Sequence, residues 1–339
     1  MGHCLGKSSI KLERPVYILS SAGVVGTKEG QGPLGMLFDL VGKDDLFGAE
    51  NWEEAESVLQ KEALRIVLGK RGIRPEEVRF LFAGDLLGQS IASSFGLGDF
   101  QIPFFGIYGA CSTCGEALTL GAMTIDGGYA ELAACVTSSH FASAEREFRF
   151  PLEYGNQRPL SASWTVTGSG AFLLGKRGEG GARAKIMGMT VGKIVDYGIK
   201  DSMNMGACMA PAAAFTIERH FEDWDRGPED YDRIVTGDLG QVGQMALLEL
   251  LQKKGIDLKE KHMDCGLEIY DTKEQDCHAG GSGCGCCAAT LSAYLLKQLE
   301  EGNWKRILFL PTGALLSKTS FNEGKTVPAI CHGVVMERV

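Results

Sequence analysis

Long hydrophobic runs and an excess of positive charge are both missing from this chain of 339 residues. No stretch reaches the ~18 uninterrupted apolar residues that a membrane-spanning helix needs, so we expect no transmembrane segment. The 34 basic residues are outnumbered by 43 acidic ones, which gives a net charge of −9. With no basic stripe to hold phosphates, we expect no nucleic-acid partner. The polar start of the chain lacks the apolar segment of a secretory signal, so we expect no signal peptide.

Complete disulfide pairing within the chain is also excluded, because its eleven cysteines are an odd number. A chain of this length folds without disulfides, so we expect reduced thiols in a cytosol-like compartment. Glycine is abundant, with 46 residues, and predicts many tight turns or close backbone approaches. The apolar content of 44% is enough for a buried core.

The chain contains an internal repeat. Residues 72–89 and 226–241 both run through a proline, two acidic residues, an apolar strand, a Gly-Asp-Leu sequence and a Gly-Gln pair. We interpret this as a duplication of one α/β unit, with halves at 15–178 and 184–339 and a glycine-rich, charged connection between them. The alternative is two unrelated α/β segments with similar turns.

Several expected strands are apolar throughout their length. They are 80–83, 132–136 and 307–310. Uniformly apolar strands are typical of sheets that are covered on both faces. The sequence therefore predicts an α/β fold with helices on each side of its sheets.

Cys111 stands out by its position. The apolar segment 104–108 runs into Gly109-Ala110-Cys111, and an Ala/Leu-rich helix follows at once. A thiol at a helix N-terminus is expected to have a lowered pKa, because the helix dipole favours the thiolate. Cys111 is thus a candidate nucleophile or anion-binding group. The alternatives are a small buried residue that allows tight packing, and a redox pair with Cys114.

A strand, a Gly-Ala-Cys turn and a helix within a duplicated α/β chain resemble the thiolase superfamily, above all its ketoacyl-acyl-carrier-protein synthase III-like branch. The segment Gly-Ser-Gly-Ala-Phe-Leu-Leu at 168–174 resembles that fold as well. The resemblance covers nearly the whole chain. It implies a five-layer α/β/α/β/α fold made of two duplicated halves, and a homodimer formed through a sheet edge.

Four shorter segments, 108–113, 136–140, 148–155 and 277–285, resemble a sporulation branch of that superfamily from spore-forming Firmicutes. This narrower resemblance implies non-catalytic binding of dipicolinic acid (pyridine-2,6-dicarboxylate), alone or as its calcium chelate. The role implied is uptake into the developing spore and release in germination. The implied partners are integral membrane proteins of the same sporulation operon. This chain would be the soluble component of a spore membrane channel complex, either soluble or peripheral at the spore inner membrane.

The resemblance is incomplete where the chemistry would occur. Synthases of this branch pair the cysteine with a histidine and an asparagine from the C-terminal half. We place the strand end that would carry the histidine at 267–273, which has no histidine, and the turn that would carry the asparagine at 283–288, which has no asparagine. Without these groups condensation loses orders of magnitude in rate. His278 lies close in sequence and could substitute. The alternative function is therefore a Cys-dependent acyltransferase or condensing enzyme acting on coenzyme A or acyl-carrier thioesters.

The family pocket at the cysteine suits a small anion, because helix N-termini, hydroxyls and an aromatic slot would surround it. From their neighbourhood in the implied fold, the expected ligand-binding residues are Cys111, Ser112, Thr113, Tyr108, Ser138, Ser139, His140, Asp271 and Cys284. The cysteine-rich run 277–287 could bind zinc or an iron–sulfur cluster, but structural zinc sites use two separated cysteine pairs. We therefore expect no metal site and no cofactor, apart from calcium arriving with the ligand.

Overall fold

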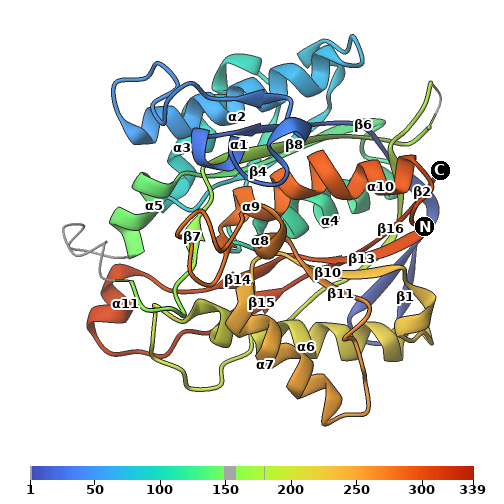
Figure 1. The fold of residues 1–339 in the computed structure, drawn as a ribbon. Coiled ribbons are helices and arrows are strands. Elements are labelled where there is room, and N and C mark those ends of the chain that lie inside the picture. The colour runs from blue at the N-terminus through green and yellow to red at the C-terminus, as the bar shows by residue number, and fades with distance from the viewer. Residues whose placement is uncertain (1, 149–157, 179) are drawn as a thin grey trace.

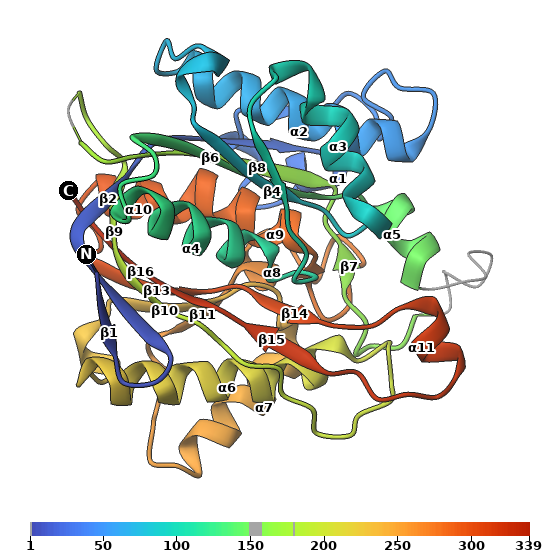
Figure 2. The ribbon, with the colours of Figure 1, turned by 180° about the vertical axis from the view of Figure 1, so that it is seen from behind.

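The computed structural model describes residues 2–148, 158–178 and 180–339. Two sheets are stacked with helices between them, and further helices cover the outer face of each sheet (Figures 1 and 2). This is the five-layer α/β/α/β/α arrangement that the family resemblance implied. Of the family-like segments, most of 148–155 lies outside the described residues.

The sheet of the first half has the strand order β5-β4-β6-β8-β2. β4 pairs in parallel with both β5 and β6, whereas β8 pairs antiparallel with β6 and with β2. The strands are β2 (Ser9–Val25), β4 (Phe80–Gly84), β5 (Phe104–Gly106), β6 (Leu132–Ser139) and β8 (Gly168–Gly175).

The sheet of the second half repeats this pattern in the order β11-β10-β13-β16-β9. β10 pairs in parallel with β11 and β13, whereas β16 pairs antiparallel with β13 and β9. The strands are β9 (Ala184–Thr190), β10 (Arg233–Thr236), β11 (His262–Asp264), β13 (Arg306–Leu310) and β16 (Gly333–Glu337). The first strands of the two halves, β2 and β9, pair antiparallel and join the two sheets.

The outer layers are amphipathic helices. α2 (Trp52–Gly69) and α3 (Ile91–Leu97) cover the first sheet, and α6 (Met205–Trp224) and α7 (Gly240–Gln252) cover the second (Figure 1). α2 begins at an Asn51 cap, whose side chain accepts a hydrogen bond from the backbone N–H of Glu54. Such a cap satisfies one of the free N–H groups of the first turn.

The middle layer consists of α4 (Thr113–Asp126) and a second helix built from α9 (Cys284–Thr290), a π-helical turn (Leu291–Leu295) and α10 (Leu296–Glu300). These helices face sheets on two sides, so they are rich in small residues, and every residue of α9 is buried. A Cβ added to Gly170 of β8 would lie only 2.6 Å from the Cβ of Ala288, which shows how closely sheet and helix approach.

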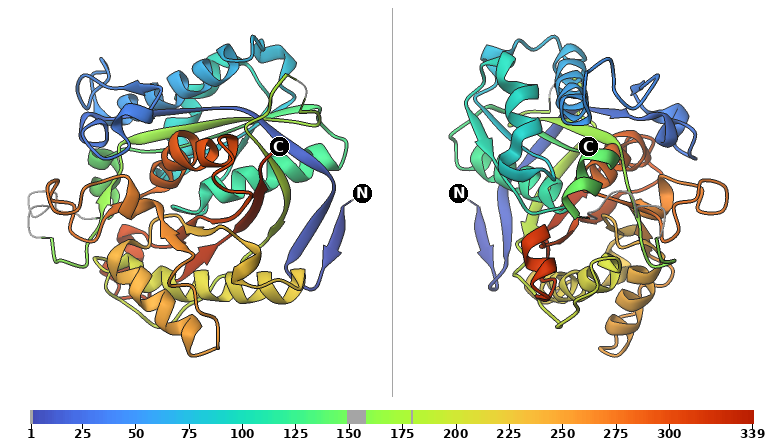
Figure 3. Two further views of the ribbon diagram at one scale, coloured as in Figure 1. Left: turned by 45° about the vertical axis from the view of Figure 1, so that its right-hand side comes forward. Right: turned by 90° about the vertical axis from the view of Figure 1, so that its left-hand side faces the viewer.

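Shorter elements complete the chain between these layers. They are β1 (His3–Leu5), α1 (Thr27–Gly30), β3 (Leu40–Val41), α5 (Phe141–Phe148), β7 (Trp164–Thr165), α8 (Cys265–Glu268), β12 (Gly281–Ser282), β14 (Thr312–Ala314), α11 (Lys318–Asn322) and β15 (Ala329–Cys331). The two chain ends lie on one side of the molecule, and α5 and α11 lie on the opposite side (Figures 1 and 3). Across the described residues, none of the helices is both long enough and apolar enough to cross a membrane.

Candidate functional site

Cys111 lies in the turn that connects β5 to α4. Ala110 adopts a positive φ of 50°, so the backbone reverses sharply before the helix. Ser112 Oγ donates to the Gly109 carbonyl at 2.6 Å, and Thr113 Oγ1 donates to the Ala110 carbonyl at 2.6 Å. Both hydroxyls, which we expected to bind the ligand, thus hold the turn that places Cys111.

The second half of the chain supplies the groups that face Cys111. Ser282 Oγ of β12 lies 4.0 Å from Cys111 Sγ and donates to Asp238 Oδ2 at 3.1 Å. The same carboxylate oxygen accepts from the backbone N–H of Gly283 at 2.9 Å, and Thr312 Oγ1 donates to Oδ1 at 2.7 Å. Asp238, just beyond β10, is therefore a buried carboxylate with three hydrogen-bond donors beside the thiol.

This environment overturns the expectation of a reactive thiolate. Cys111 is only 5% exposed, and burial raises the pKa of its thiol well above the usual range. The nearby Asp238 carboxyl raises the pKa further, because two negative charges repel each other. The thiol therefore stays protonated near neutral pH, and the helix N-terminus does not outweigh these two effects.

The strand end at 267–273, which we aligned with the histidine-bearing strand end of the synthases, was also misplaced. Leu267 and Glu268 belong to α8, not to the end of a strand. The strand end that faces Cys111 is that of β10, which leads to Gly237 and Asp238. The error arose because a short helix follows β11 directly, and its apolar residues look like a strand in the sequence.

The turn at the start of α9 does face Cys111, as expected. Cys284 packs with Cys111, Leu86 and Ala144 in a small apolar cluster. Its thiol donates to the backbone carbonyl of Ser138 at 2.8 Å. Within the described parts of the chain, no histidine and no amide side chain forms a hydrogen bond with Cys111.

The expected ligand residues at the end of β6 are buried and bonded within the protein. Ser138 Oγ donates to Glu56 Oε1 at 2.8 Å, and Ser139 Oγ donates to the Val166 carbonyl at 2.7 Å. His140 Nε2 bonds to the Asp45 carbonyl at 2.7 Å, and its Nδ1 accepts from the backbone N–H of Ala142. Burial lowers the pKa of His140, so the ring is neutral with its proton on Nε2.

Two expected residues from the second half lie in a different loop. Asp271 is exposed, and its carboxylate accepts from the backbone N–H groups of Lys273 and Glu274 within a turn. His278 bonds to the Pro159 carbonyl at 2.9 Å and pairs with Asp276 at 3.2 Å. The structure does not bring either side chain into the group around Cys111.

A cavity of ≈ 320 Å³ opens next to Cys111. Tyr108, which is 45% exposed, lies on its wall together with Leu86, Leu87 and Glu147. Leu86 also packs against Cys111, so an apolar side chain separates the thiol from this cavity. The volume falls in the range of small-molecule pockets.

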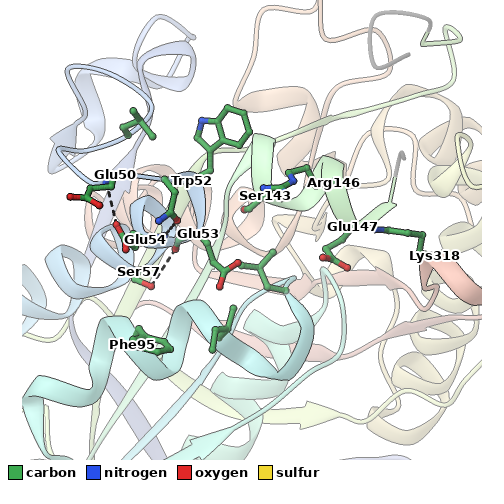
Figure 4. A pocket seen from close by; sticks show the side chains of 14 residues that line it. Glu50, Trp52, Glu53, Glu54, Ser57, Phe95, Ser143, Arg146, Glu147 and Lys318 are labelled. Atoms are coloured by element: carbon green, nitrogen blue, oxygen red, sulfur yellow. Dashed lines mark hydrogen bonds between the residues drawn. The ribbon is translucent and has the colours of Figure 1, made fainter. Parts of the chain in front are cut away.

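A larger cavity of ≈ 810 Å³ adjoins it and shares Leu87 and Glu147 (Figure 4). α5 contributes Ser143 and Arg146 to this cavity, and the start of α11 contributes Lys318. The opposite wall, from the start of α2, is acidic. The two cations are therefore set among several carboxylates.

The cysteine-rich run shows no metal-binding arrangement. All eleven cysteines are free thiols. In the portion of the chain that the structure describes, no three His, Cys, Asp or Glu side chains are grouped as metal ligands would be. The thiols of the run are buried: Cys277, Cys286 and Cys287 belong to the hydrophobic core, and Cys284 packs beside Cys111.

Sequence reasoning missed Asp238, Ser282 and the buried Glu56. The signal for Asp238 was present, because it belongs to the repeated Gly-Asp-Leu sequence that also contains Asp85. That repeat was interpreted only as evidence of duplication. In the second half, the acid of this sequence lies beside Ser282 and Cys111.

The whole chain matches known proteins. Residues 6–337 match the family model described as stage V sporulation protein AD. The chain is 43% identical over 334 residues to stage V sporulation protein AD of Bacillus subtilis (strain 168), covering 98% of this chain and 97% of that protein.

Solved structures of similar fold are much more distant in sequence. The 3-oxoacyl-[acyl-carrier-protein] synthase III of Aquifex aeolicus VF5 superposes with a TM-score of 0.55 at 14% identity, covering 95% of this chain and 99% of that one. The human mitochondrial 3-ketoacyl-CoA thiolase superposes with a TM-score of 0.59 at 13% identity, covering 97% and 100%. These likenesses concern the fold, and the family is given by the sequence: the chain belongs to the stage V sporulation protein AD family.

Proposed function

We propose that this protein binds dipicolinic acid without transforming it. The observation that carries the proposal is the environment of Cys111, a buried thiol that faces Asp238, Ser282 and Cys284 beneath a cavity. Acyl transfer needs an activated thiol and donors for an oxyanion. A buried carboxylate beside the sulfur works against both requirements.

The cavities beside Cys111 have features that suit a flat aromatic dicarboxylate. Tyr108 and Leu86 offer an apolar wall, and Arg146 and Lys318 offer positive charge on the adjoining wall. Specific ligands commonly bind in such mixed sites, where apolar surface gives affinity and few polar groups set orientation. In this proposal the ligand lies above Leu86 and leaves the thiol unmodified.

Titration calorimetry with dipicolinate, with and without calcium, tests the binding. We expect heat of binding for the wild-type protein and a large loss of affinity for Leu86→Trp, whose ring would fill the smaller cavity. Glu62→Gln on the outer face of α2 is the matched control and is expected to bind normally. The absence of heat and of any thermal shift at millimolar ligand would contradict the proposal, for both the free acid and its chelate.

Membership of this family supports a role in sporulation. We propose that the protein lies peripherally at the spore inner membrane. Its proposed partners are integral membrane proteins of the same operon. Dipicolinate would be delivered to them for uptake into the spore and received from them in germination. Co-purification of the wild-type chain with those proteins from detergent-solubilised spore membranes is the expected result. If Leu86→Trp co-purifies and supports spore function as well as the wild type does, the protein is a scaffold with an idle cavity.

We also propose a homodimer formed through strand β5, the last strand of the first sheet. Its unpaired edge carries the exposed rings of Phe104 and Phe105. An exposed apolar edge strand is a ready surface for pairing with a second copy. Light scattering is expected to give twice the chain mass, and Phe105→Glu is expected to reduce it to the chain mass.

The second candidate function is acyl transfer through Cys111, which the fold of the neighbouring enzymes favours. It predicts covalent labelling by radioactive acetyl-coenzyme A that is lost in Cys111→Ala. The binding proposal predicts no such label.

A further inference from the structure

Two carboxyl groups, Glu56 on α2 and Asp85 just after β4, are buried behind the wall of the larger cavity. The hydrogen-bond partners that the structure describes for them are neutral hydroxyl and backbone N–H groups, not cations. Burial raises the pKa of Glu56, and the charge of Asp85 raises it further. A buried carboxyl pair of this kind favours a state with at least one bound proton.

A continuous chain of hydrogen bonds links the two groups. Ser138 Oγ donates to Glu56 Oε1 at 2.8 Å, and Ser93 Oγ donates to Asp85 Oδ2 at 2.6 Å. Gln60 Nε2 lies between them and donates to both hydroxyls, at 2.8 and 2.9 Å. The charge on one carboxyl is therefore felt by the other through an ordered polar path.

Ser143 connects this pair to the cavity. Its Oγ lies 2.8 Å from Glu56 Oε2 and 3.2 Å from the His140 carbonyl, and the side chain lines the larger cavity. A hydroxyl has one proton to donate, and a carbonyl can only accept. When Ser143 donates elsewhere, its contact with Glu56 remains a hydrogen bond only if Glu56 carries a proton.

The electrostatic surroundings of Glu56 are mainly acidic. His140 is neutral because burial lowers its pKa, and Arg146 is the cation that α5 contributes. The titratable or charged groups on the elements packed around Glu56 are Glu53, Asp85, His140, Glu145, Arg146, Glu147 and Cys284. Adding a dianion to this set raises the tendency of the carboxyl pair to hold a proton.

We propose that Glu56 and Asp85 form a proton-binding site whose occupancy is coupled to anion binding in the adjoining cavity. This inference rests on the proposed function. In the ligand-bound state Glu56 Oε2 carries a proton, its O–H donates to Ser143 Oγ, and the Ser143 hydroxyl turns to donate to a ligand carboxylate. Where Glu56 is ionised before the ligand arrives, this proton is taken from solvent together with dipicolinate. The neutral calcium chelate needs less proton uptake.

Burial raises the pKa of Glu56 to about 8, so ligand-free Glu56 is mostly ionised only above that pH. Calorimetry at pH 9 in borate and in Tris therefore measures this coupling, because the two buffers release protons with different heats. At this pH we expect the wild-type protein to take up close to one proton per dipicolinate bound, and we expect its affinity to fall up to tenfold per unit rise in pH. Glu56→Gln, which imitates the protonated side chain, is expected to bind with little proton uptake and little pH dependence. Glu62→Gln is the control and keeps the wild-type uptake.

Infrared spectra of the ligand-free protein separate this inference from the binding proposal. A carboxylic-acid band at pH 7 that is absent from Glu56→Gln supports the proton site even if dipicolinate gives no heat, in which case the proposed function alone fails. Wild-type binding without proton uptake, or equal uptake in Glu56→Gln, overturns the inference and leaves the binding function intact. Should Glu56→Gln not fold, Ser143→Ala is expected to keep the band and lose the uptake, and unchanged uptake overturns the coupling.

Discussion

Asp85 and Asp238 occupy the same place in the two halves of the repeat but have different kinds of partners. Asp85 accepts from the backbone N–H of Leu87 and from the N–H and hydroxyl of Ser93, which are close in the chain. Asp238 instead accepts from Ser282, Gly283 and Thr312, which come from distant segments.

The two acids, at corresponding positions of the repeat, therefore have different structural roles. In the first half the acid accepts hydrogen bonds from its own loop and is buried, with Glu56, behind the wall of the larger cavity. In the second half the acid joins β10, β12 and β14 beneath Cys111 and suppresses ionisation of the thiol. The same Gly-Asp-Leu sequence thus occurs in both halves, and its acid has different hydrogen-bond partners in each.

The largest expected effect is on stability. Asp238→Ala leaves three buried donors without an acceptor, so we expect the free energy of unfolding to fall by about 3–5 kcal/mol. Asp85→Ala disturbs mainly local bonds, and we expect a loss of about 1–3 kcal/mol. Urea denaturation measures both. Equal losses would show that the two acids do not differ in structural role.

The next effect concerns pH. The folded-state pKa of Glu56 is raised above its unfolded value, so the protonated side chain stabilises the fold at low pH and this contribution is lost as the pH rises. We expect wild-type stability to fall relative to Glu56→Gln above about pH 4.5, by at most ~1.4 kcal/mol per pH unit, until the folded-state pKa is reached. Parallel curves of unfolding free energy against pH would contradict a bound proton at Glu56.

The smallest expected effect is on the reactivity of Cys111. Removing the negative charge in Asp238→Asn lowers the thiol pKa, and we expect alkylation of Cys111 by iodoacetamide at pH 8 to become about tenfold faster. Rates are followed by peptide mass spectrometry, with Asp85→Asn as the matched variant from the other half. Equal acceleration in both variants would indicate general loosening of the fold and not the loss of a specific repulsion.

Much of the fold could be predicted from the sequence, because its signals are local. The apolar strands β4, β6 and β13 and the Gly-Ala-Cys turn before α4 appear where their residues indicated. Family resemblance added the five-layer arrangement, which no local pattern gives.

The site was harder to predict because it depends on contacts between distant segments. Asp238 lies beside Cys111 because the two sheets are stacked, and the sequence does not show this stacking. The helix dipole predicted a lowered pKa for the Cys111 thiol, but burial, which was not visible in the sequence, raises it. Ser112, Thr113, Ser138 and Ser139 looked available as hydroxyls but serve internal hydrogen bonds. Asp271 was named from its position near an expected strand end, which the structure places elsewhere.

The central claim is that the protein binds dipicolinate and does not transform it. The most direct test is a crystal structure of the protein soaked with dipicolinate. The account predicts ligand density in the cavities bordered by Tyr108, Leu86 and Ser143, with the Cys111 sulfur unmodified below Leu86. Collapsed cavities with no bound ligand, or an imidazole and an amide side chain converging on the Cys111 sulfur, would contradict it.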